Sequence, residues 1–178
     1  MNEVTAGLLP EGLRDRLPPQ AEAAAALLRG VLDTVASHGY ERVQPPLVEY
    51  EESLTGRVGA ESGGNAKLLR FVDPVTQRTL ALRPDITGQA GRIATTRLAH
   101  YARPLRLSYG GPVLRVKGTQ LNPEREMIQA GAELIGSDGV AAVTEVLLLA
   151  VEALQSARLE TLSAAVTLPS FVGALAAG

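Results

Sequence analysis

Polar and apolar residues alternate over positions 125–135 (REMIQAGAELI), and this pattern constrains the fold more than any other feature of the sequence. An alternation with a period of two predicts a β-strand whose successive side chains point to opposite faces of a sheet. We expect the apolar face to lie against the core and the other face to be open. The apolar face carries Ile128, Ala130, Ala132 and Leu134, and the other face carries Arg125, Met127, Gln129, Gly131 and Glu133.

Three helices are predicted elsewhere in the chain. Apolar residues recur at helical spacing after Pro18-Pro19, and Gly39 is a natural stop for this first helix. A second helix is expected from Asp85 to about residue 98, with Asp85 as its N-cap. A third helix should follow a cap at Asp138.

Short apolar stretches bounded by turn residues predict the strands. Residues 68–72 and 79–82 should form a hairpin, 105–109 and 113–116 two strands separated by a turn at 110–112 (GGP), and 162–166 a further strand. Residues 40–50 should form an edge or interface strand, because Pro45 and Pro46 lack the N–H that a central strand needs. Residues 55–66, with four glycines, predict a mobile loop. We therefore expect one α+β domain over residues 1–178, with an antiparallel sheet flanked by helices.

Composition excludes several classes of function. The 178 residues include no cysteine, which rules out disulfides, thiolate metal sites and a cysteine nucleophile. A formal net charge of −2 provides no broad basic surface, so binding of transfer RNA is disfavoured. Two histidines far apart do not favour a zinc site. The sequence contains no uncharged run of about twenty apolar residues, so no segment of it is expected to span a membrane. We expect a cytoplasmic protein, and we expect neither a metal nor a cofactor.

A candidate ligand site follows from the strand at 125–135. Gly131 has no side chain, so a small polar ligand would fit between Gln129 and Glu133. Asp85 lies at the predicted start of a helix and could reach the same ligand. Arg115 would also point toward this ligand if the faces of the two strands match. Carboxylates and an amide suit an ammonium group, with each hydrogen bond to that charge contributing roughly 1.5–3 kcal/mol. An amino-acid ligand, with an arginine opposite its carboxylate, matches this pattern.

The same residues also have purely structural interpretations. Asp85 follows Pro84 and suits a helix N-cap. Glu133 beside Arg115 or Arg125 suits a surface salt bridge of little energetic weight. Periodicity alone leaves both interpretations open.

Three short motifs stand in order along the chain: LRPDIT at residues 82–87, GPVLR at 111–115 and QAGAELIG at 129–136. They resemble, in turn, the LRPEGT segment of histidyl-tRNA synthetases, the start of class II motif 2 and that family's QxGxExxG strand. Residues 12–18 resemble the family's opening, and the helix leading into residues 45–48 resembles motif 1, so motif 1 spans about 20–50 and motif 2 about 105–136. The resemblance implies a class II synthetase-like core and a homodimer through motif 1. It also implies a histidine site, for which the expected residues are Asp85, Thr87, Arg115, Gln129 and Glu133.

Two positions depart from the synthetase pattern. Lys117 replaces a glutamate that helps to place ATP, and residues 118–123 (GTQLNP) lack an arginine that contacts ATP phosphate. Asp85 and Ile86, in place of Glu and Gly, are similar to the regulatory subunits of ATP phosphoribosyltransferase, a family of synthetase paralogues. That resemblance implies a protein without chemistry of its own. It would associate with a short catalytic subunit, activate it and take part in histidine feedback in the first step of histidine biosynthesis.

Two alternatives stay open. One is a histidyl-tRNA synthetase fragment that forms histidyl-adenylate, in which Arg115 stabilises the phosphate. The other is a dimerising module. The family pattern continues with motif 3, which is absent by Gly178, so we also expect an unpaired sheet edge and an exposed apolar face.

Overall fold

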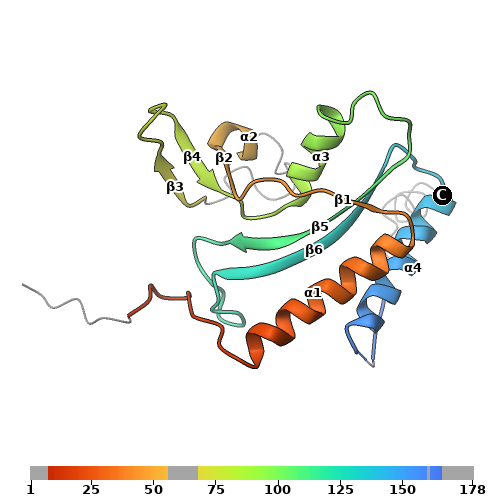
Figure 1. The fold of residues 1–178 in the computed structure, drawn as a ribbon, viewed down its shortest axis with the longest axis horizontal. Coiled ribbons are helices and arrows are strands. Elements are labelled where there is room, and N and C mark those ends of the chain that lie inside the picture. Colours follow the sequence, from red (N-terminus) through yellow and green to blue (C-terminus); the bar gives the residue numbers. More distant parts are fainter. Residues whose placement is uncertain (1–7, 56–67, 160, 166–178) are drawn as a thin grey trace, which may run out of the picture.

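The computed structural model describes residues 8–55, 68–159 and 161–165. Two long strands, β5 and β6, run across the molecule with helices on both sides (Figure 1). The expected α+β class is confirmed. The elements in chain order are α1 (Gln20–Ser37), β1 (Glu41–Arg42), β2 (Val48–Tyr50), α2 (Glu51–Thr55), β3 (Arg70–Val72), β4 (Thr79–Leu82), α3 (Thr87–Thr95), β5 (Leu105–Leu114), β6 (Glu126–Ile135) and α4 (Val140–Ser156).

Strands β5 and β6 form an antiparallel pair of ten residues each, in register from Leu105 opposite Ile135 to Leu114 opposite Glu126. The strand predicted from the alternation is therefore confirmed as β6. The turn predicted at residues 110–112 is wrong, because β5 runs through them without interruption.

Pro112 fits inside β5 because none of the described strands pairs with that side of β5 at this point. Leu114 donates its N–H to the Arg83 carbonyl at 3.1 Å, on the side away from β6. Backbone groups two residues apart point the same way, so the donor that Pro112 lacks would also have pointed away from β6. Strand β1 pairs with β5 only near Leu107 and Ser108 and does not reach this point.

The strands divide into two sheets, with the orders β1-β5-β6 and β2-β4-β3. The predicted hairpin is confirmed as β3 and β4, but it pairs with β2 and not with β5, and β1 runs parallel to β5. The expectation of one antiparallel sheet is therefore wrong. Pro45 and Pro46 divide residues 40–50 into β1 and β2, and each of these lies at the edge of its sheet, as the prolines predicted.

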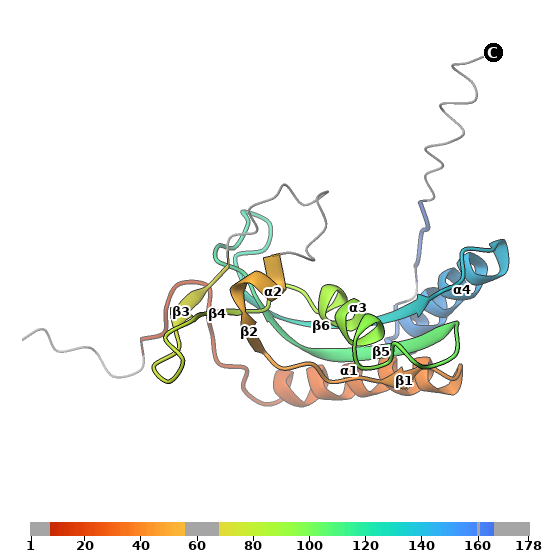
Figure 2. The same cartoon turned by 90° about the horizontal axis from the view of Figure 1, so that it is seen from above.

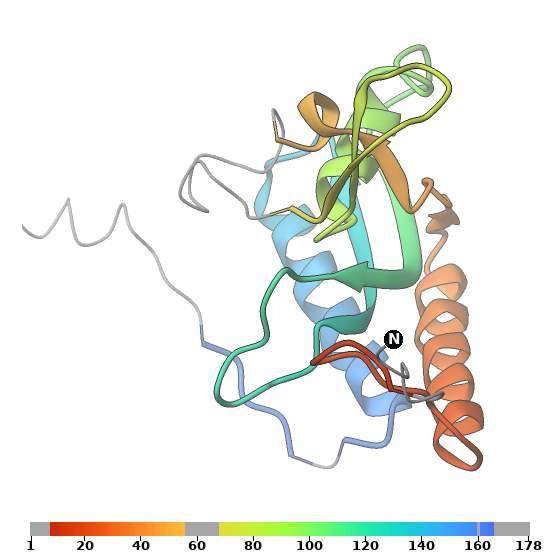
Figure 3. The ribbon, with the colours of Figure 1, turned by 90° about the vertical axis from the view of Figure 1, so that its left-hand side faces the viewer.

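Helices cover both faces of the β5–β6 pair. Helix α1 contacts it from one side and α3 from the other (Figure 2). Helix α4 packs against α1, where Val35 and Tyr40 meet Leu149 and Ala153. Figure 3 shows the small sheet at the top, α1 at the lower right and α4 behind β5 and β6.

The helix predictions are confirmed with shifted starts. Helix α3 begins at Thr87, two residues after Asp85, and the N-cap of α4 is Gly139 and not Asp138. Residues 161–165 are irregular where a strand was expected. Of the predicted loop at 55–66, Thr55 ends α2 and the rest lies outside the described residues.

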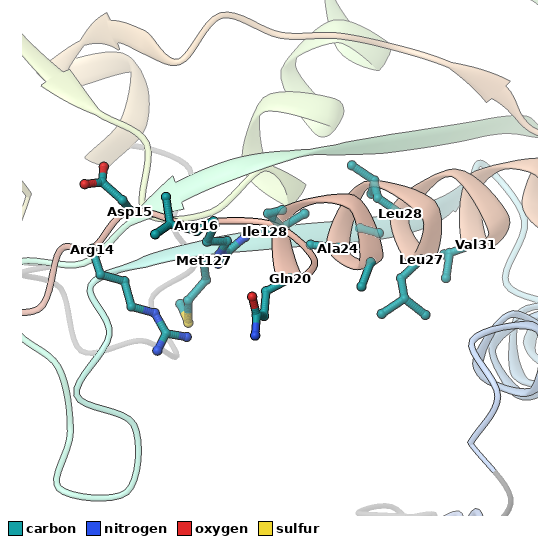
Figure 4. A pocket seen from close by; sticks show the side chains of 13 residues that line it. Arg14, Asp15, Arg16, Gln20, Ala24, Leu27, Leu28, Val31, Met127 and Ile128 are labelled. Carbon is teal, nitrogen blue, oxygen red and sulfur yellow. The ribbon is translucent and has the colours of Figure 1, made fainter.

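The apolar face of β6 is covered only in part. Ala132 packs against the α1–α4 cluster, whereas Ile128 is 41% exposed. Together with Leu27 of α1, Ile128 lines an open groove of about 980 Å³ that residues 14–17 close at one end (Figure 4). The prediction that the whole apolar face lies against the core is therefore wrong in the first half of the strand.

Candidate functional site

Asp85 and Gln129 meet where α3 begins against β6. Gln129 Nε2 donates to Asp85 Oδ2 at 2.8 Å, and Gln129 Oε1 accepts the N–H of Ile86 at 2.9 Å. Asp85 Oδ1 also accepts the N–H of Gly88 at 3.3 Å. The N-cap of α3 is Ile86 and not Asp85 as predicted, although Asp85 accepts from the first turn of the helix and is also bound to the polar face of β6.

Thr87 and Glu133 are joined through Tyr109, a residue of β5. The Tyr109 hydroxyl donates to Glu133 Oε1 at 2.9 Å and lies 2.7 Å from Thr87 Oγ1. Only 3% of Tyr109 is exposed. Tyr109 was not predicted from the sequence, because the alternation within β6 does not show which residue of β5 lies opposite Gly131.

Gly131 makes room for the ring of Tyr109. A Cβ atom at Gly131 would lie 2.5 Å from Cζ and 2.7 Å from Cε2 of that ring. The expectation that a small ligand fills the gap between Gln129 and Glu133 is therefore wrong, since a side chain from the neighbouring strand fills it.

Arg83 holds the segment that carries Asp85 and Thr87 in place. It is 5% exposed, and it donates from Nε to the Pro112 carbonyl at 2.8 Å and from Nη1 to the Pro45 carbonyl at 2.9 Å. Burial lowers the pKa of the Arg83 guanidinium. These hydrogen bonds connect the outer edge of β5 with the loop between β1 and β2. Because Arg83 shortly precedes α3 in the chain, they also fix where that helix begins.

The structure does not bring Arg115 into this network. Strand β5 ends at Leu114, and Arg115 is exposed just beyond it. Its backbone N–H donates to the Arg125 carbonyl at 2.8 Å. Within residues 8–55, 68–159 and 161–165, no hydrogen bond or ion pair joins the Arg115 guanidinium to Asp85 or Glu133.

Asp85 and Glu133 place two negative charges close to Tyr109. Neither carboxylate forms a salt bridge within the described part of the chain, so the surface ion pair considered for Glu133 does not form there. Burial raises the pKa of Tyr109, and both carboxylates raise it further, so its hydroxyl keeps its proton. Asp85 and Glu133 are half-buried and Thr87 is exposed, so solvent reaches the network. Such a group of acceptors suits a cationic ligand.

Among the residues that the structure describes, no group of three or more histidine, aspartate or glutamate side chains could hold a metal ion. No helix among them is long and apolar enough to cross a membrane.

Solved structures identify the class of fold. An ATP phosphoribosyltransferase regulatory subunit/histidyl-tRNA synthetase from Bacillus halodurans C matches with a TM-score of 0.74 at 32% identity, over 88% of this chain and 40% of that one. Apo histidyl-tRNA synthetase from S. aureus matches with a TM-score of 0.68 at 22% identity, over 84% of this chain and 39% of that one. The chain therefore has the class II histidyl-tRNA synthetase-like fold, as predicted.

Sequence comparison identifies the family. The histidyl-tRNA synthetase family matches residues 12–178, so the chain belongs to that family. A protein of Paramagnetospirillum magneticum named ATP phosphoribosyltransferase regulatory subunit is 52% identical over 168 residues, which are 94% of this chain and 44% of the relative. A protein of the same name from Rhodospirillum rubrum is 51% identical over 168 residues, covering 94% of this chain and 43% of the relative. The chain spans less than half the length of these two relatives.

Proposed function

We propose that this chain belongs to a regulatory subunit of ATP phosphoribosyltransferase that has no chemistry of its own. The observation that carries the proposal is the 52% identity with a regulatory subunit across 94% of this chain. Lys117, which is exposed, and the missing arginine in residues 118–123 point the same way, because both changes remove groups that would handle ATP. The partner would be a catalytic ATP phosphoribosyltransferase subunit, which this protein activates and makes sensitive to histidine.

We further propose that histidine is the ligand and that the site receives its ammonium group. Asp85, Thr87 and Glu133 offer acceptors and two negative charges, and no described cation is paired with either carboxylate. Gln129 acts by orienting Asp85, because its amide is bound at both ends. Arg115, exposed at the end of β5, is the proposed partner of the ligand's carboxylate, which it would meet after a movement of its side chain.

Calorimetry of the full-length protein with histidine tests the ligand assignment. Asp85→Asn should weaken binding by about tenfold or more, because a hydrogen bond to a charged group contributes roughly 1.5–3 kcal/mol. Asp33→Asn makes the same change at an exposed position of α1 and should leave the affinity unchanged. Absence of binding to the unaltered full-length protein would overturn the histidine assignment.

Reconstitution tests the regulatory assignment. A short ATP phosphoribosyltransferase catalytic subunit should be more active when mixed with the full-length protein, and histidine should inhibit the mixture. The competing function is that of a histidyl-tRNA synthetase, which is the description of the matching family. Histidine-dependent exchange of pyrophosphate into ATP by the full-length protein would decide for the synthetase.

We also propose a homodimer formed through the motif 1 region, residues 20–50. Helix α1 of this region leaves Leu27 48% exposed on the groove that it shares with β6. Light scattering coupled to size-exclusion chromatography of the full-length protein should give twice the mass of one chain, and a monomer would contradict the proposal.

A further inference from the structure

A single proton fixes the direction of the hydrogen bonds from Thr87 to Glu133. An ionised carboxylate can only accept, so the one hydroxyl proton of Tyr109 goes to Glu133 Oε1, 2.9 Å away. The 2.7 Å contact between the Tyr109 and Thr87 hydroxyls then requires Thr87 to be the donor. Thr87 Oγ1 has thereby used its only proton, and it can offer a ligand nothing but lone pairs.

The other half of the site is oriented in the same sense. The Gln129 carbonyl oxygen is taken by the N–H of Ile86, so the amide presents its N–H₂ to Asp85. Asp85 accepts from that group and from Gly88, and it has no proton of its own to give while ionised. Asp85, Thr87 and Glu133 can therefore only accept hydrogen bonds from a ligand.

We infer that Tyr109 is a positioning residue that makes this end of the site selective for an ammonium group. Its hydroxyl forces Thr87 into the acceptor role and holds Glu133 in place, and its ring stays fixed over Gly131. The inference rests on the proposed function, because it states which part of histidine this end of the site recognises. An ammonium group brings three donors to these acceptors, whereas a ligand without one leaves them unpaired.

Removing only the hydroxyl separates this role from packing. Tyr109→Phe keeps the ring over Gly131, but it frees the Thr87 proton and takes a donor away from Glu133. Tyr40→Phe is the matched control. Tyr40 is also 3% exposed and also donates to a glutamate, Glu145 at 3.0 Å, but it lies in the α1–α4 cluster away from the site.

Calorimetry of the full-length protein with three ligands tests the inference. Histidine has an ammonium and a carboxylate group, histamine has only the ammonium group, and imidazolepropionate has only the carboxylate group. We expect Tyr109→Phe to weaken the binding of histidine and of histamine by the same factor, about tenfold, and to leave the affinity for imidazolepropionate unchanged. Tyr40→Phe should change none of the three affinities. An equal loss for all three ligands in Tyr109→Phe would indicate general distortion and overturn the inference.

Thr87 provides a second, independent variant. Thr87→Val should weaken the binding of histidine and histamine as Tyr109→Phe does. Thr87→Ser, which keeps the hydroxyl, should retain most of the affinity. The effects of Thr87→Val and Tyr109→Phe should not multiply in the double variant, because both break the same chain of hydrogen bonds. If Tyr109→Phe fails to fold, the comparison of valine with serine at Thr87 still decides. If both Tyr109→Phe and Thr87→Val bind histidine as tightly as the unaltered protein, the inference about Tyr109 is overturned but the proposed function stands. If the unaltered protein does not bind histidine, both the inference and the proposed histidine site are overturned.

Discussion

Gly131 of β6 and Tyr109 of β5 lie opposite each other, and the space that Gly131 leaves is the space that Tyr109 fills. The ring of Tyr109 takes the place of the side chain that Gly131 lacks, and this brings the hydroxyl within reach of Thr87 and Glu133. A glycine in a strand interior normally weakens the strand. Here it permits a buried tyrosine to connect two elements at the site.

Gly131→Ala should therefore destabilise the protein. The added methyl group would lie 2.5 Å from Cζ of Tyr109, and overpacking of this kind costs about 1–3 kcal/mol. Gly91→Ala is the matched control, since a Cβ there meets nothing within 4 Å, and alanine in a helix should stabilise by about 0.5–1 kcal/mol. Urea unfolding of both variants gives the two values. Equal stabilities would mean that the ring moves aside without cost.

The site was predictable in part from single residues. Alternation within β6 placed Gln129 and Glu133 on one face, and the start of a helix placed Asp85. The structure joins Asp85 to Gln129 directly and Glu133 to Thr87 through Tyr109. Tyr109 was missed because strand register depends on pairing, which one strand does not reveal. Arg115 was placed by extending the alternation of β5 by one residue past its end at Leu114.

At the scale of elements, the segment at residues 110–112 shows how packing overrides a turn pattern. A Cβ on Gly110 would lie 2.7 Å from Leu28 Cδ1 of α1, and a Cβ on Gly111 would lie 2.6 Å from Nη2 of Arg83. The two glycines therefore let a helix and a buried guanidinium approach opposite faces of β5. Glycine and proline together predict a turn. The prediction was wrong because the residues that approach these glycines lie far away in the chain and do not show in the local pattern.

Arg83 should be sensitive even to a conservative change. Arg83→Lys loses the planar guanidinium that reaches the carbonyls of Pro112 and Pro45 together, so we expect a loss of about 2 kcal/mol or more. Arg70→Lys is the control, because Arg70 is half exposed and paired with Glu51, an arrangement that contributes less than about 1 kcal/mol. Urea unfolding distinguishes the two variants. Similar losses would show that Arg83 does not fix the edge of β5.

Helix α4 is joined to β5 by an ion pair whose strength depends on pH. Arg106 donates to both carboxylate oxygens of Glu145, at 2.7 and 2.8 Å, and Tyr40 donates at 3.0 Å. The hydrogen bonds from Arg106, followed by that from Tyr40, lower the pKa of Glu145 from 4.5 to about 2. A carboxyl group with a lowered pKa in the folded state stabilises that state above its unfolded pKa, and this contribution is lost as the pH falls through the folded pKa.

Glu145→Gln should therefore destabilise the protein most at pH 7. The difference from the unaltered protein should shrink as the pH falls from 4.5 toward about 2, because the original carboxyl group also becomes neutral in that range. Urea midpoints measured at pH 7, 4 and 3 give the curve. Glu152→Gln serves as control, since Glu152 is paired with the exposed His38 and its substitution should have little effect. A difference that stays constant with pH would contradict the role assigned to Glu145.

At the scale of the whole molecule, the division into two sheets leaves β6 at an outer edge. The order β1-β5-β6 gives this ten-residue strand a partner on one side only among the described residues. Next to that edge, the groove between α1 and β6 exposes 66% of Leu17, 48% of Leu27 and 41% of Ile128. Long open edges and contiguous apolar faces favour association with another chain.

We therefore predict that the 178-residue chain, produced by itself, associates with copies of itself through this groove. Ile128→Lys and Leu27→Lys each place a charge on an apolar wall of the groove (Figure 4), and each should weaken the association at least about tenfold, as expected for residues central to an interface. Leu121→Lys is the matched control, because Leu121 is 100% exposed and does not line the groove. Sedimentation equilibrium over a range of concentrations measures the effect. Equal weakening by all three substitutions would show that net charge controls the association, and a monomer at every concentration would show that the groove does not bind a second copy.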